Sequence, residues 1–548
     1  MVKVQRRWAP VGIGMAAGLL MVGVGLTPAM AVDPEDLEDR VTVAGVRAHL
    51  DALQAIATAN GGNRAAGTTG YEASGQYIEQ VLTAAGYKPV RHDFEATTQS
   101  IDDYSLAIDG ITFTDDEDGD GAPGPLGLPM EFTPSTPVAG LTDVPLIAPA
   151  VATGCDDSEW GDVDATGQIA IVSRGVCAFS EKSAAAGRAG ALAVIVYNTE
   201  AVPLAGTLGE QTPDLIPSVG ILPSQGQTIL AAMALGPVTA DLQLQQTVSV
   251  IQTFNITADT PTGNPENTVM LGAHLDSVLE GPGINDNGSG SAAILETAVQ
   301  LAASGPLTNR VRFAWWGAEE LGLFGSADYV AGLVEQEETD DIVTYLNFDM
   351  IGSPNYVISV YDADESTYEA PVEVPAGSIE TEDALTDYFD EIGQPWIDTA
   401  FDGRSDYDAF ISAGIAASGL FTGADDVKTA DEAALFGGTV GEAHDQNYHS
   451  AGDDIDNIND TALGIMIGAI AHVTAEFAND VSGIPGAVLA PVPPTPTPTP
   501  TPILAIADPE LLAESGGEAE TAWGAGATLL LGLGVLTLVA ARRRTRIS

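Results

Sequence analysis

Residue types that bind metal ions and transfer protons recur near the ends of short apolar runs in this sequence. They are His274, Asp276, Asp286, Glu319, Glu320 and Asp349. Histidine nitrogens and carboxylate oxygens are common zinc ligands, and a positioned carboxylate can take a proton from an attacking water. Singly, each has a plainer explanation, because Asp before Gly usually marks a turn or cap and a glutamate pair usually faces solvent. Because all of these residues lie near the ends of successive apolar runs, we interpret them together as one site.

The apolar runs themselves predict the strands of an α/β sheet. The expected strands cover residues 268–273, 311–316, 342–348 and 415–420, and helix-like segments cover 291–303 and 323–333. Parallel strands buried on both faces have such sequences, and ligands of these sheets bind outside the carboxyl ends of the strands. We therefore expect a mixed, largely parallel central sheet flanked by helices, with the candidate residues gathered at one edge.

Six motifs follow one another along the second half of the chain. They are HLDS, NDNGSG, WGAEELGLFGS, NFDMIGSP, DGRSDYDAF and YHSAGD. Together they resemble the co-catalytic zinc aminopeptidases of the secreted bacterial leucine-aminopeptidase type, a family whose fold is shared by glutamate carboxypeptidase and glutaminyl cyclase. The segment RAAGTTGY, residues 64–71, resembles the N-terminal part of that family. The resemblance implies a zinc-peptidase fold and a hydrolase that releases N-terminal amino acids from peptides.

By this resemblance, two zinc ions per chain are expected on five side chains. His274 and Asp349 would bind one ion, Glu320 and His449 the other, and Asp286 would bridge both. The charges support this assignment, because three carboxylates and a bridging hydroxide balance two divalent ions while both histidines stay neutral. The resemblance therefore predicts a metal cluster without net charge.

The same resemblance assigns roles to residues around the ions. Glu319 would be the general base, Asp276 would orient the ring of His274, and Tyr448 would donate a hydrogen bond to the developing oxyanion. Arg404 would lie near the backbone of the substrate. Neighbouring residues on extended backbone point in different directions, so Glu319 can serve a water while the next glutamate binds metal.

Residues 135–249 resemble a different module, the protease-associated domain, which is a small β-rich insertion in many exported peptidases. The resemblance is carried by the runs GQIAIVSRGVCAF and AGALAVIVYN, which alternate apolar strands with a small-residue helix. The two cysteines of the chain, Cys155 and Cys177, both lie here and are expected to pair in an oxidising exterior. The flanking residues, 32–134 and 250–485, are then expected to form one interrupted catalytic domain.

The N-terminus carries the features of a targeting segment. Residues 1–31 combine basic residues, an apolar core and the small-residue pattern Ala29-Met30-Ala31. We interpret them as a signal peptide cleaved after Ala31, with an uncleaved membrane helix as the alternative. Both interpretations predict export.

The C-terminus carries the features of a surface anchor. Residues 486–521 form a Pro- and Thr-rich stalk and include LAESG, residues 512–516, which resembles a sortase signal of the Leu-Ala-x-Thr-Gly type. Residues 522–541 are an uncharged apolar segment of membrane-spanning length, and residues 542–548 form a basic tail expected to stay cytoplasmic. Cell-wall sorting and a plain transmembrane helix both remain open.

The charge balance limits the partners of this protein. It has 77 acidic and 19 basic residues, for a net charge of -58, so nucleic acids and other polyanions are repelled. Seven of the basic residues lie in the two terminal segments, which leaves 12 for the rest. Because a carboxypeptidase holds the substrate carboxylate with Arg or Lys, this scarcity favours an aminopeptidase acting on peptides with a free N-terminus.

Other functions remain as alternatives. A carboxypeptidase or a glutaminyl cyclase would have the same fold, and a protein of another class, a catalytically silent cell-surface binding protein, could carry the same inserted module. The complete set of expected ligands together with Glu319 argues against the silent protein, because a silent homologue is free to lose some of them. An aminopeptidase remains the preferred interpretation.

The loop around Tyr448 and His449 departs from the resembled family. Secreted members often have cysteines flanking this loop, whereas Asn447 and Gly452 stand here. Calcium is a further possible cofactor, because acidic residues follow the loop, although a solvated acidic loop is the plainer interpretation. These residues are Asp453, Asp454 and Asp456.

Overall fold

The computed structural model describes residues 32–113, 125–199, 204, 206–209 and 212–488. The expected signal peptide, residues 1–31, lies outside this part. So do residues 489–548, which contain most of the expected stalk, the sorting signal, the transmembrane segment and the basic tail.

The central sheet is mixed, and its four inner strands run parallel. The strand order in this part is β13-β12-β14-β11-β9-β10-β8. The parallel strands are β9 (Asn264–His274), β10 (Asn309–Trp316), β11 (Ile342–Phe348) and β14 (Ala417–Phe421). On the outside lie β8 (Thr239–Asp259), β12 (Ser359–Tyr361) and β13 (Ile397–Thr399). The four strands predicted from the apolar runs overlap β9, β10, β11 and β14, and the largely parallel sheet is confirmed.

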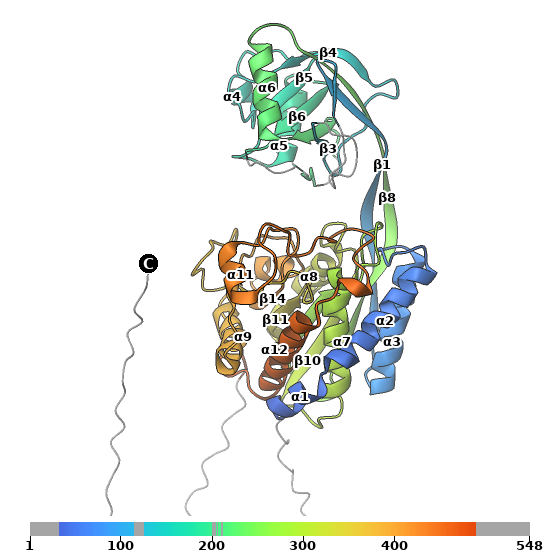
Figure 1. Ribbon diagram of the computed structural model, residues 1–548, viewed down its shortest axis with the longest axis vertical. Coiled ribbons are helices and arrows are strands. Elements are labelled where there is room, and N and C mark those ends of the chain that lie inside the picture. Colours follow the sequence, from blue (N-terminus) through green and yellow to red (C-terminus); the bar gives the residue numbers. More distant parts are fainter. Residues whose placement is uncertain (1–31, 114–124, 200–203, 205, 210–211, 489–548) are drawn as a thin grey trace, which may run out of the picture. The chain divides into compact units, whose positions relative to one another are not determined.

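Helices cover both faces of this sheet, which buries its inner strands (Figure 1). One apolar core joins the sheet to seven helices, namely α1 (Pro34–Arg40), α2 (Val43–Ala59), α3 (Thr69–Ala85), α7 (Gly290–Leu301), α9 (Ser378–Ile392), α11 (Ala430–Phe436) and α12 (Asp460–Asn479). A second core joins it to α8 (Phe324–Gln336) and α10 (Asp408–Ser412), and a loop connects α11 to α12. All seven residues of β11 are buried, as expected of a strand between two helical layers.

Helix α12 is unusually apolar. Among the described residues it is the one helix long and apolar enough to cross a membrane, but 72% of that segment is buried inside the protein. Its inward residues pack with α1, α9 and the sheet in the larger core. We therefore interpret α12 as a core helix.

The inserted module has cores of its own. Its sheet continues from β8 through β4 (Leu141–Ile147), β5 (Ile169–Ser173), β6 (Ala193–Tyr197), β7 (Ser218–Ile221) and β3 (Gly127–Pro129). Its helices are α4 (Asp157–Trp160), α5 (Phe179–Arg188) and α6 (Pro223–Met233). Two apolar clusters, distinct from those around the central sheet, hold these elements together.

Two long strands connect the module to the central sheet. Strand β1 (Val90–Ile108) pairs antiparallel with β8 along almost its whole length, from Val90 opposite Thr257 to Ile108 opposite Ala240. Strand β2 (Ile111–Phe113) forms a hairpin with the end of β1, and its Phe113 packs in a core of the module. The chain leaves the central sheet along β1 and returns to it along β8, and these two strands are paired side by side. A module can therefore be inserted between them without interrupting the central sheet.

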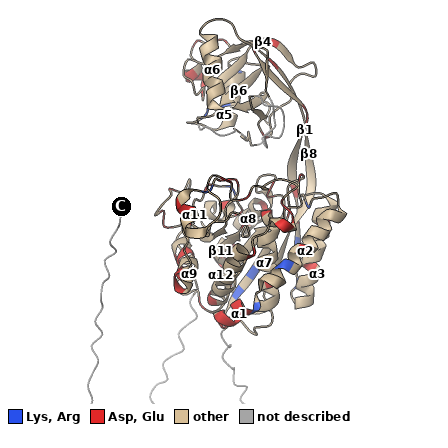
Figure 2. Ribbon diagram, in the orientation of Figure 1, with Lys and Arg blue, Asp and Glu red and all other residues tan. Residues whose placement is uncertain are grey.

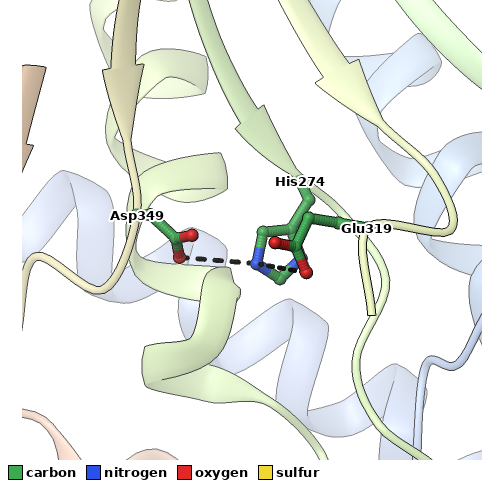
Figure 3. A group of neighbouring side chains, drawn as sticks. All are labelled: His274, Glu319 and Asp349. Carbon is green, nitrogen blue, oxygen red and sulfur yellow. Dashed lines mark ion pairs between the residues drawn. The ribbon is translucent and has the colours of Figure 1, made fainter. Parts of the chain in front are cut away.

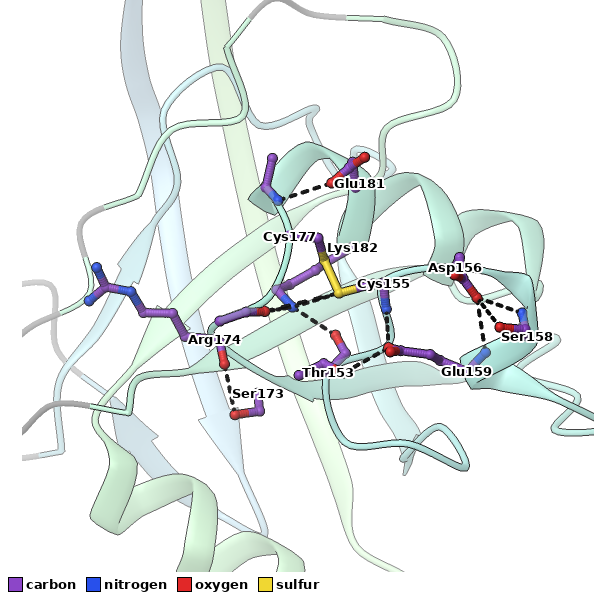
Figure 4. The surroundings of a disulfide bond; sticks show 12 residues. Thr153, Cys155, Asp156, Ser158, Glu159, Ser173, Arg174, Cys177, Glu181 and Lys182 are labelled. Atoms are coloured by element: carbon purple, nitrogen blue, oxygen red, sulfur yellow. Dashed lines mark hydrogen bonds between the residues drawn. A yellow bond between two sulfur atoms is a disulfide. The ribbon is translucent and has the colours of Figure 1, made fainter. Parts of the chain in front are cut away.

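The two cysteines of the module form a disulfide, Cys155–Cys177, which closes a sequence separation of 22 residues (Figure 4). Beside it the buried ammonium of Lys182 donates hydrogen bonds to the carbonyls of Thr153, at 2.9 Å, and Gly175, at 2.8 Å. Both carbonyls lie within two residues of a cysteine. The disulfide and the lysine therefore hold the same two loops together.

Acidic residues recur along helices such as α1, α9 and α11, as the red segments of Figure 2 show. In contrast, several carboxylates of the described residues are buried at the carboxyl ends of the central strands, including Asp276, Asp286 and Asp349. Buried carboxylates require compensation by hydrogen bonds or cations.

Candidate metal centre

Three neighbouring strands place His274, Glu319 and Asp349 around one space (Figure 3). His274 is the last residue of β9, Glu319 follows β10 after a two-residue turn, and Asp349 directly follows β11. Nε2 of His274 lies 3.4 Å from Oδ1 of Asp349 and 3.9 Å from Oε2 of Glu319. The parallel order β10-β9-β11 brings these three strand ends to one edge of the sheet.

The carboxylate of Asp286 lies between two histidines. It belongs to the short segment η1 (Ile284–Ser289), which leads into α7 and in which Asp286 and Asn287 depart from helical backbone angles. Its Oδ1 lies 3.1 Å from Nε2 of His274, and its Oδ2 lies 3.2 Å from Nε2 of His449. One oxygen faces each imidazole, which is the arrangement that a carboxylate bridging two cations needs.

The loop between α11 and α12 supplies Tyr448 and His449. Nε2 of His449 lies 3.0 Å from Oε2 of Glu320, and its ring stacks on that of Tyr448 with centroids 3.8 Å apart. The side chain of His449 is 42% exposed, whereas that of His274 is 1% exposed. The site thus has a buried side and a side open to solvent.

The donor atoms of these residues form groups that could hold metal ions. The described residues contain three groups of potential ligand atoms, and the atoms within each group lie within 4.8 Å of one another. Two of these groups share His274, one with Glu319 and Asp349 and the other with Asp286 and Glu320; the third consists of Asp362, Glu382 and Asp398. Buried atoms of three of these residues have no hydrogen-bond partner, namely Nε2 of His274, Oε1 of Glu320 and Oδ1 of Asp349. Imidazole and carboxylate donors with unfilled capacity suit zinc.

The electrostatics of the site indicate a deficit of positive charge. Burial, reinforced by the Asp286 carboxylate, raises the pKa of Glu320 to about 7, and burial raises the pKa of Asp276 to about 6. Burial by itself lowers the pKa of His449, but hydrogen bonds to Asp286 and Glu320 raise it to about 11. Two divalent cations would offset the mutual repulsion of these carboxylates.

Comparison with known proteins agrees with this arrangement. The chain matches the model of peptidase family M28 over residues 255–474 and that of the PA domain over residues 142–229. It is 41% identical over 462 residues to a probable lipoprotein aminopeptidase, LpqL, of Mycobacterium tuberculosis, which covers 83% of this chain and 89% of that protein. The chain belongs to peptidase family M28. An inserted PA domain accompanies the M28 domain.

Two further proteins similar to this M28 chain are also named as aminopeptidases. Leucine aminopeptidase 2 of Arthroderma otae is 39% identical over 455 residues, which cover 83% of this chain and 88% of that protein. A solved structure of BSAP, a zinc aminopeptidase from Bacillus subtilis, has a TM-score of 0.52 at 25% identity, over 79% of this chain and 95% of that chain.

The contacts of Asp276 in this M28 site differ from the sequence-based expectation. Nδ1 of His274 lies 3.1 Å from the backbone carbonyl oxygen of Asp276 and 3.8 Å from its carboxylate. The carboxylate instead accepts hydrogen bonds from the backbone N–H groups of Glu319, at 3.2 Å, and Glu320, at 3.4 Å. Asp276 thus contacts the imidazole through its backbone and holds the glutamate turn through its side chain.

Two residues of the site were not singled out from the sequence. Ser405 Oγ donates a 2.6 Å hydrogen bond to Oδ2 of Asp349 and itself accepts one from Nδ2 of Asn347. Arg64 is fully buried and donates to the backbone carbonyls of Leu275, Pro282 and Gly283. Both lie in motifs that support the family resemblance, DGRSDYDAF and RAAGTTGY. Their position in these motifs is the sequence feature that could have identified them.

A cavity of about 200 Å³ opens beside the candidate ligands. Asp286, Glu319, Asp349 and Tyr448 line its inner end, and Arg404 lines it as well. Its other walls combine aromatic, apolar and acidic side chains, including Met350, Tyr361, Tyr368, Asp402, Phe421 and Asp426. A space of this size and composition can accommodate one amino-acid side chain.

The guanidinium of Arg404 already has an acidic partner. Its Nη2 lies 3.3 Å from Oδ1 of Asp425, and the arginine side chain is 53% exposed. Burial alone lowers the pKa of Arg404, but Tyr448, Asp425 and Asp402 raise it above its usual value. The positive charge at the cavity is therefore balanced within the protein.

Proposed function

We propose that this chain is a two-zinc aminopeptidase that releases N-terminal amino acids from peptides by hydrolysis. The observation that carries this proposal is the position of Asp286, whose two carboxylate oxygens face His274 and His449. Its relatives include proteins named as aminopeptidases and a zinc aminopeptidase, which supports the same activity.

The metal ligands in this proposal are shared between two ions. His274 and Asp349 would hold one ion, Glu320 and His449 would hold the other, and Asp286 would lie between the two. The distances among these side chains, 3.0 to 3.4 Å for the closest oxygen and nitrogen atoms, support this division. When bound, zinc lowers the pKa of a water and polarises a carbonyl group.

Glu319 acts as the general base in this mechanism. Its carboxylate borders the cavity and lies 3.9 Å from Nε2 of His274, farther than the carboxylates of Asp286 and Asp349, which supports a role toward a water instead of a metal ion. It removes a proton from the attacking water as the new C–O bond forms, and it delivers that proton to the departing amine when the tetrahedral oxyanion collapses and the peptide C–N bond breaks. Its turn is held by the two backbone hydrogen bonds to Asp276.

Tyr448 stabilises the oxyanion that forms on the substrate carbonyl. Burial and the neighbouring carboxylate of Asp286 raise the pKa of Tyr448 well above that of free tyrosine. Its phenol therefore remains protonated at neutral pH and can donate a hydrogen bond where negative charge develops.

The charges around the cavity favour a substrate with a free amino terminus. Asp402 and Asp426 line the cavity, and Arg404 is paired with Asp425 instead of standing ready for a substrate carboxylate. An ammonium group is attracted to such a site, whereas a terminal carboxylate is repelled. This supports an aminopeptidase over a carboxypeptidase, and the complete donor set argues against a silent binding protein.

We further propose that the protein is exported and held at the cell surface. Residues 1–31 have the features of a signal peptide, and residues 522–548 those of an anchor with a basic tail. A disulfide in the PA domain supports folding in an oxidising compartment. Wall sorting through residues 512–516 and retention by a membrane helix are the two anchoring routes.

A substrate screen combined with metal analysis tests the activity. The purified protein should hydrolyse aminoacyl-nitroanilides but neither N-blocked peptides nor acylated glutamate substrates. A chelator should abolish the activity, and zinc should restore it. Elemental analysis should find two zinc ions per chain. One zinc per chain would instead favour a cyclase-like enzyme, and cleavage of acylated glutamate substrates would favour a carboxypeptidase.

A further inference from the structure

The loop that carries His449 depends on contacts with other segments of the chain to hold this histidine in position. Unlike His274 and Asp349, His449 does not stand at the end of a strand, and its side chain is 42% exposed. No cysteine lies in the connection between α11 and α12, because both cysteines of the chain belong to the disulfide of the PA domain. Yet Nε2 of His449 must stay about 3 Å from carboxylates of two other segments.

Asp445 supports this loop before His449. It is 2% exposed, and its carboxylate accepts hydrogen bonds from three donor groups. The donors are the backbone N–H of Asn447 at 2.8 Å, Nδ2 of Asn285 at 2.6 Å, and Nδ2 of Asn457 at 2.9 Å. Asn285 is the neighbour of Asp286, so Asp445 ties the His449 loop to the segment of the bridging carboxylate.

Asp453 supports the loop after His449. It is also 2% exposed, and its two oxygens accept hydrogen bonds from the backbone N–H groups of Asn285, at 2.8 Å, and Asp286, at 3.0 Å. Its backbone carbonyl accepts a further hydrogen bond from the N–H of Ile284. Nδ2 of Asn457 lies between the two aspartates and donates to both.

Only a carboxylate satisfies the donors at these positions. An ionised aspartate is acceptor-only and has about four lone-pair sites, whereas asparagine replaces one oxygen with a donating NH₂ group. At position 445 that group would face Nδ2 of Asn285 or Asn457, and at position 453 it would face a backbone N–H. Buried donors left without acceptors are costly, so the two loops would separate.

We propose that Asp445 and Asp453 are positioning residues that lock the His449 loop to the Asp286 segment and thereby form the zinc site of Glu320 and His449. This inference rests on the proposed two-zinc function. Neither aspartate touches a reacting atom, and both act through residues that do. The neighbouring segments also pack tightly, because a Cβ on Gly281 would lie 2.0 Å from the carbonyl oxygen of Ser450.

The test compares Asp445→Asn and Asp453→Asn with Asp431→Asn in the full chain. Asp431 is exposed on α11, just before the loop, and provides the same change of charge outside the network. Zinc dissociation constants are measured by competition with a chromophoric chelator. We expect one of the two ions to bind about 10- to 100-fold more weakly in both network variants, with kcat recovering in excess zinc. The control should match the wild type.

A reciprocal exchange separates positioning from general destabilisation. In Asn285→Asp combined with Asp445→Asn, the donor and the acceptor change places, so the link between the loops is restored. We expect this double variant to regain at least part of the zinc affinity lost in Asp445→Asn. If an aspartate variant does not fold, Asn457→Ala, which removes the shared donor, is expected to weaken the same ion.

The outcomes distinguish this inference from the proposed function. If the wild type binds fewer than two zinc ions, the two-zinc function is wrong whatever the variants do. If the wild type binds two ions and the folded network variants keep both affinities, the positioning role is wrong. Equal weakening of both ions, without recovery in the exchanged double variant, would also overturn it.

Discussion

The adjacent side chains of Glu319 and Glu320 face different histidines. Oε2 of Glu319 lies 3.9 Å from Nε2 of His274, and Oε2 of Glu320 lies 3.0 Å from Nε2 of His449. Their backbone N–H groups meet at one acceptor, the carboxylate of Asp276. A single hydrogen-bonded turn thus presents two carboxylates in two directions, and we expect their removal to have different consequences.

Glu319→Gln should abolish most turnover while leaving both zinc ions bound. The amide has nearly the same shape as the carboxylate but cannot accept the proton of the attacking water. We expect kcat to fall by about 100- to 10,000-fold, with little change in the binding of a competitive inhibitor. Steady-state kinetics and elemental analysis of the same preparation check this result.

Glu320→Ala should lose metal instead. A missing carboxylate leaves one cation undercoordinated, so we expect about one zinc per chain after dialysis and partial recovery of activity in excess zinc. The comparison between the two variants is decisive. Near-normal turnover in Glu319→Gln, or loss of zinc from Glu319→Gln but not from Glu320→Ala, would contradict the proposed roles.

The sequence predicted the buried side of this site better than its open side. His274 and Asp349 stand at the ends of apolar runs, and parallel strands necessarily bring such ends to one edge of the sheet. Tyr448 and His449 lie in an irregular loop without periodicity, so only the family resemblance pointed to them. The aspartates that support this loop act through hydrogen bonds to a segment more than 150 residues away in sequence.

Other features depended on tertiary structure that local patterns do not encode. Arg64 lies in a segment that resembles a family motif. The hydrogen bonds that it donates to three backbone carbonyls, however, form only when the loop between β9 and η1 folds around its side chain. The resemblance to a PA domain began near residue 135, yet Phe113 already packs in the core of that module. Sequence motifs identify a module, whereas strand pairing such as that of β1 with β8 shows how it is attached.

Ser405→Ala should weaken the zinc site of His274 and Asp349. Ser405 donates to Oδ2 of Asp349, which leaves Oδ1 directed toward His274. Without that bond the carboxylate can rotate, so we expect about a 10-fold loss of affinity for one ion and a smaller fall in kcat/KM. Ser412→Ala, at an exposed position on α10, is the matched control. Unchanged zinc affinity in Ser405→Ala would rule out this role.

Truncation tests the proposed anchor. A chain ending before Ala522 lacks the apolar segment and the basic tail, so it should be released into the medium, whereas the full chain should stay with the cells. Immunoblots of cell and medium fractions measure this. Release of the full chain by muramidase would identify wall attachment, and release only by detergent would identify a membrane helix. Identical fractionation of both chains would refute the anchor.

Glu382, on α9, should make the stability of the protein depend on pH. It is 5% exposed, and its Oε2 accepts hydrogen bonds from the backbone N–H groups of Ala363 and Asp364. Burial, followed by the carboxylate charges of Asp364 and Asp362, raises its pKa to about 7. In an unfolded chain the same carboxyl has a pKa of about 4.3, so between these values the folded protein binds a proton that the unfolded chain has released.

The sign of the effect follows from that difference. Stability from this group is fully present below about pH 4 and is lost as the pH rises toward 7, because ionisation is unfavourable only in the folded state. Glu382→Gln keeps an acceptor for both N–H groups without the charge. We expect it to be more stable than the wild type at pH 8 by on the order of 1 to 3 kcal/mol, and about equal at pH 4.5. Urea unfolding of the zinc-loaded enzyme across this range measures the difference, with Glu391→Gln, exposed on the same helix, as control. Parallel stability curves for Glu382→Gln and the wild type would show that Glu382 does not titrate with folding.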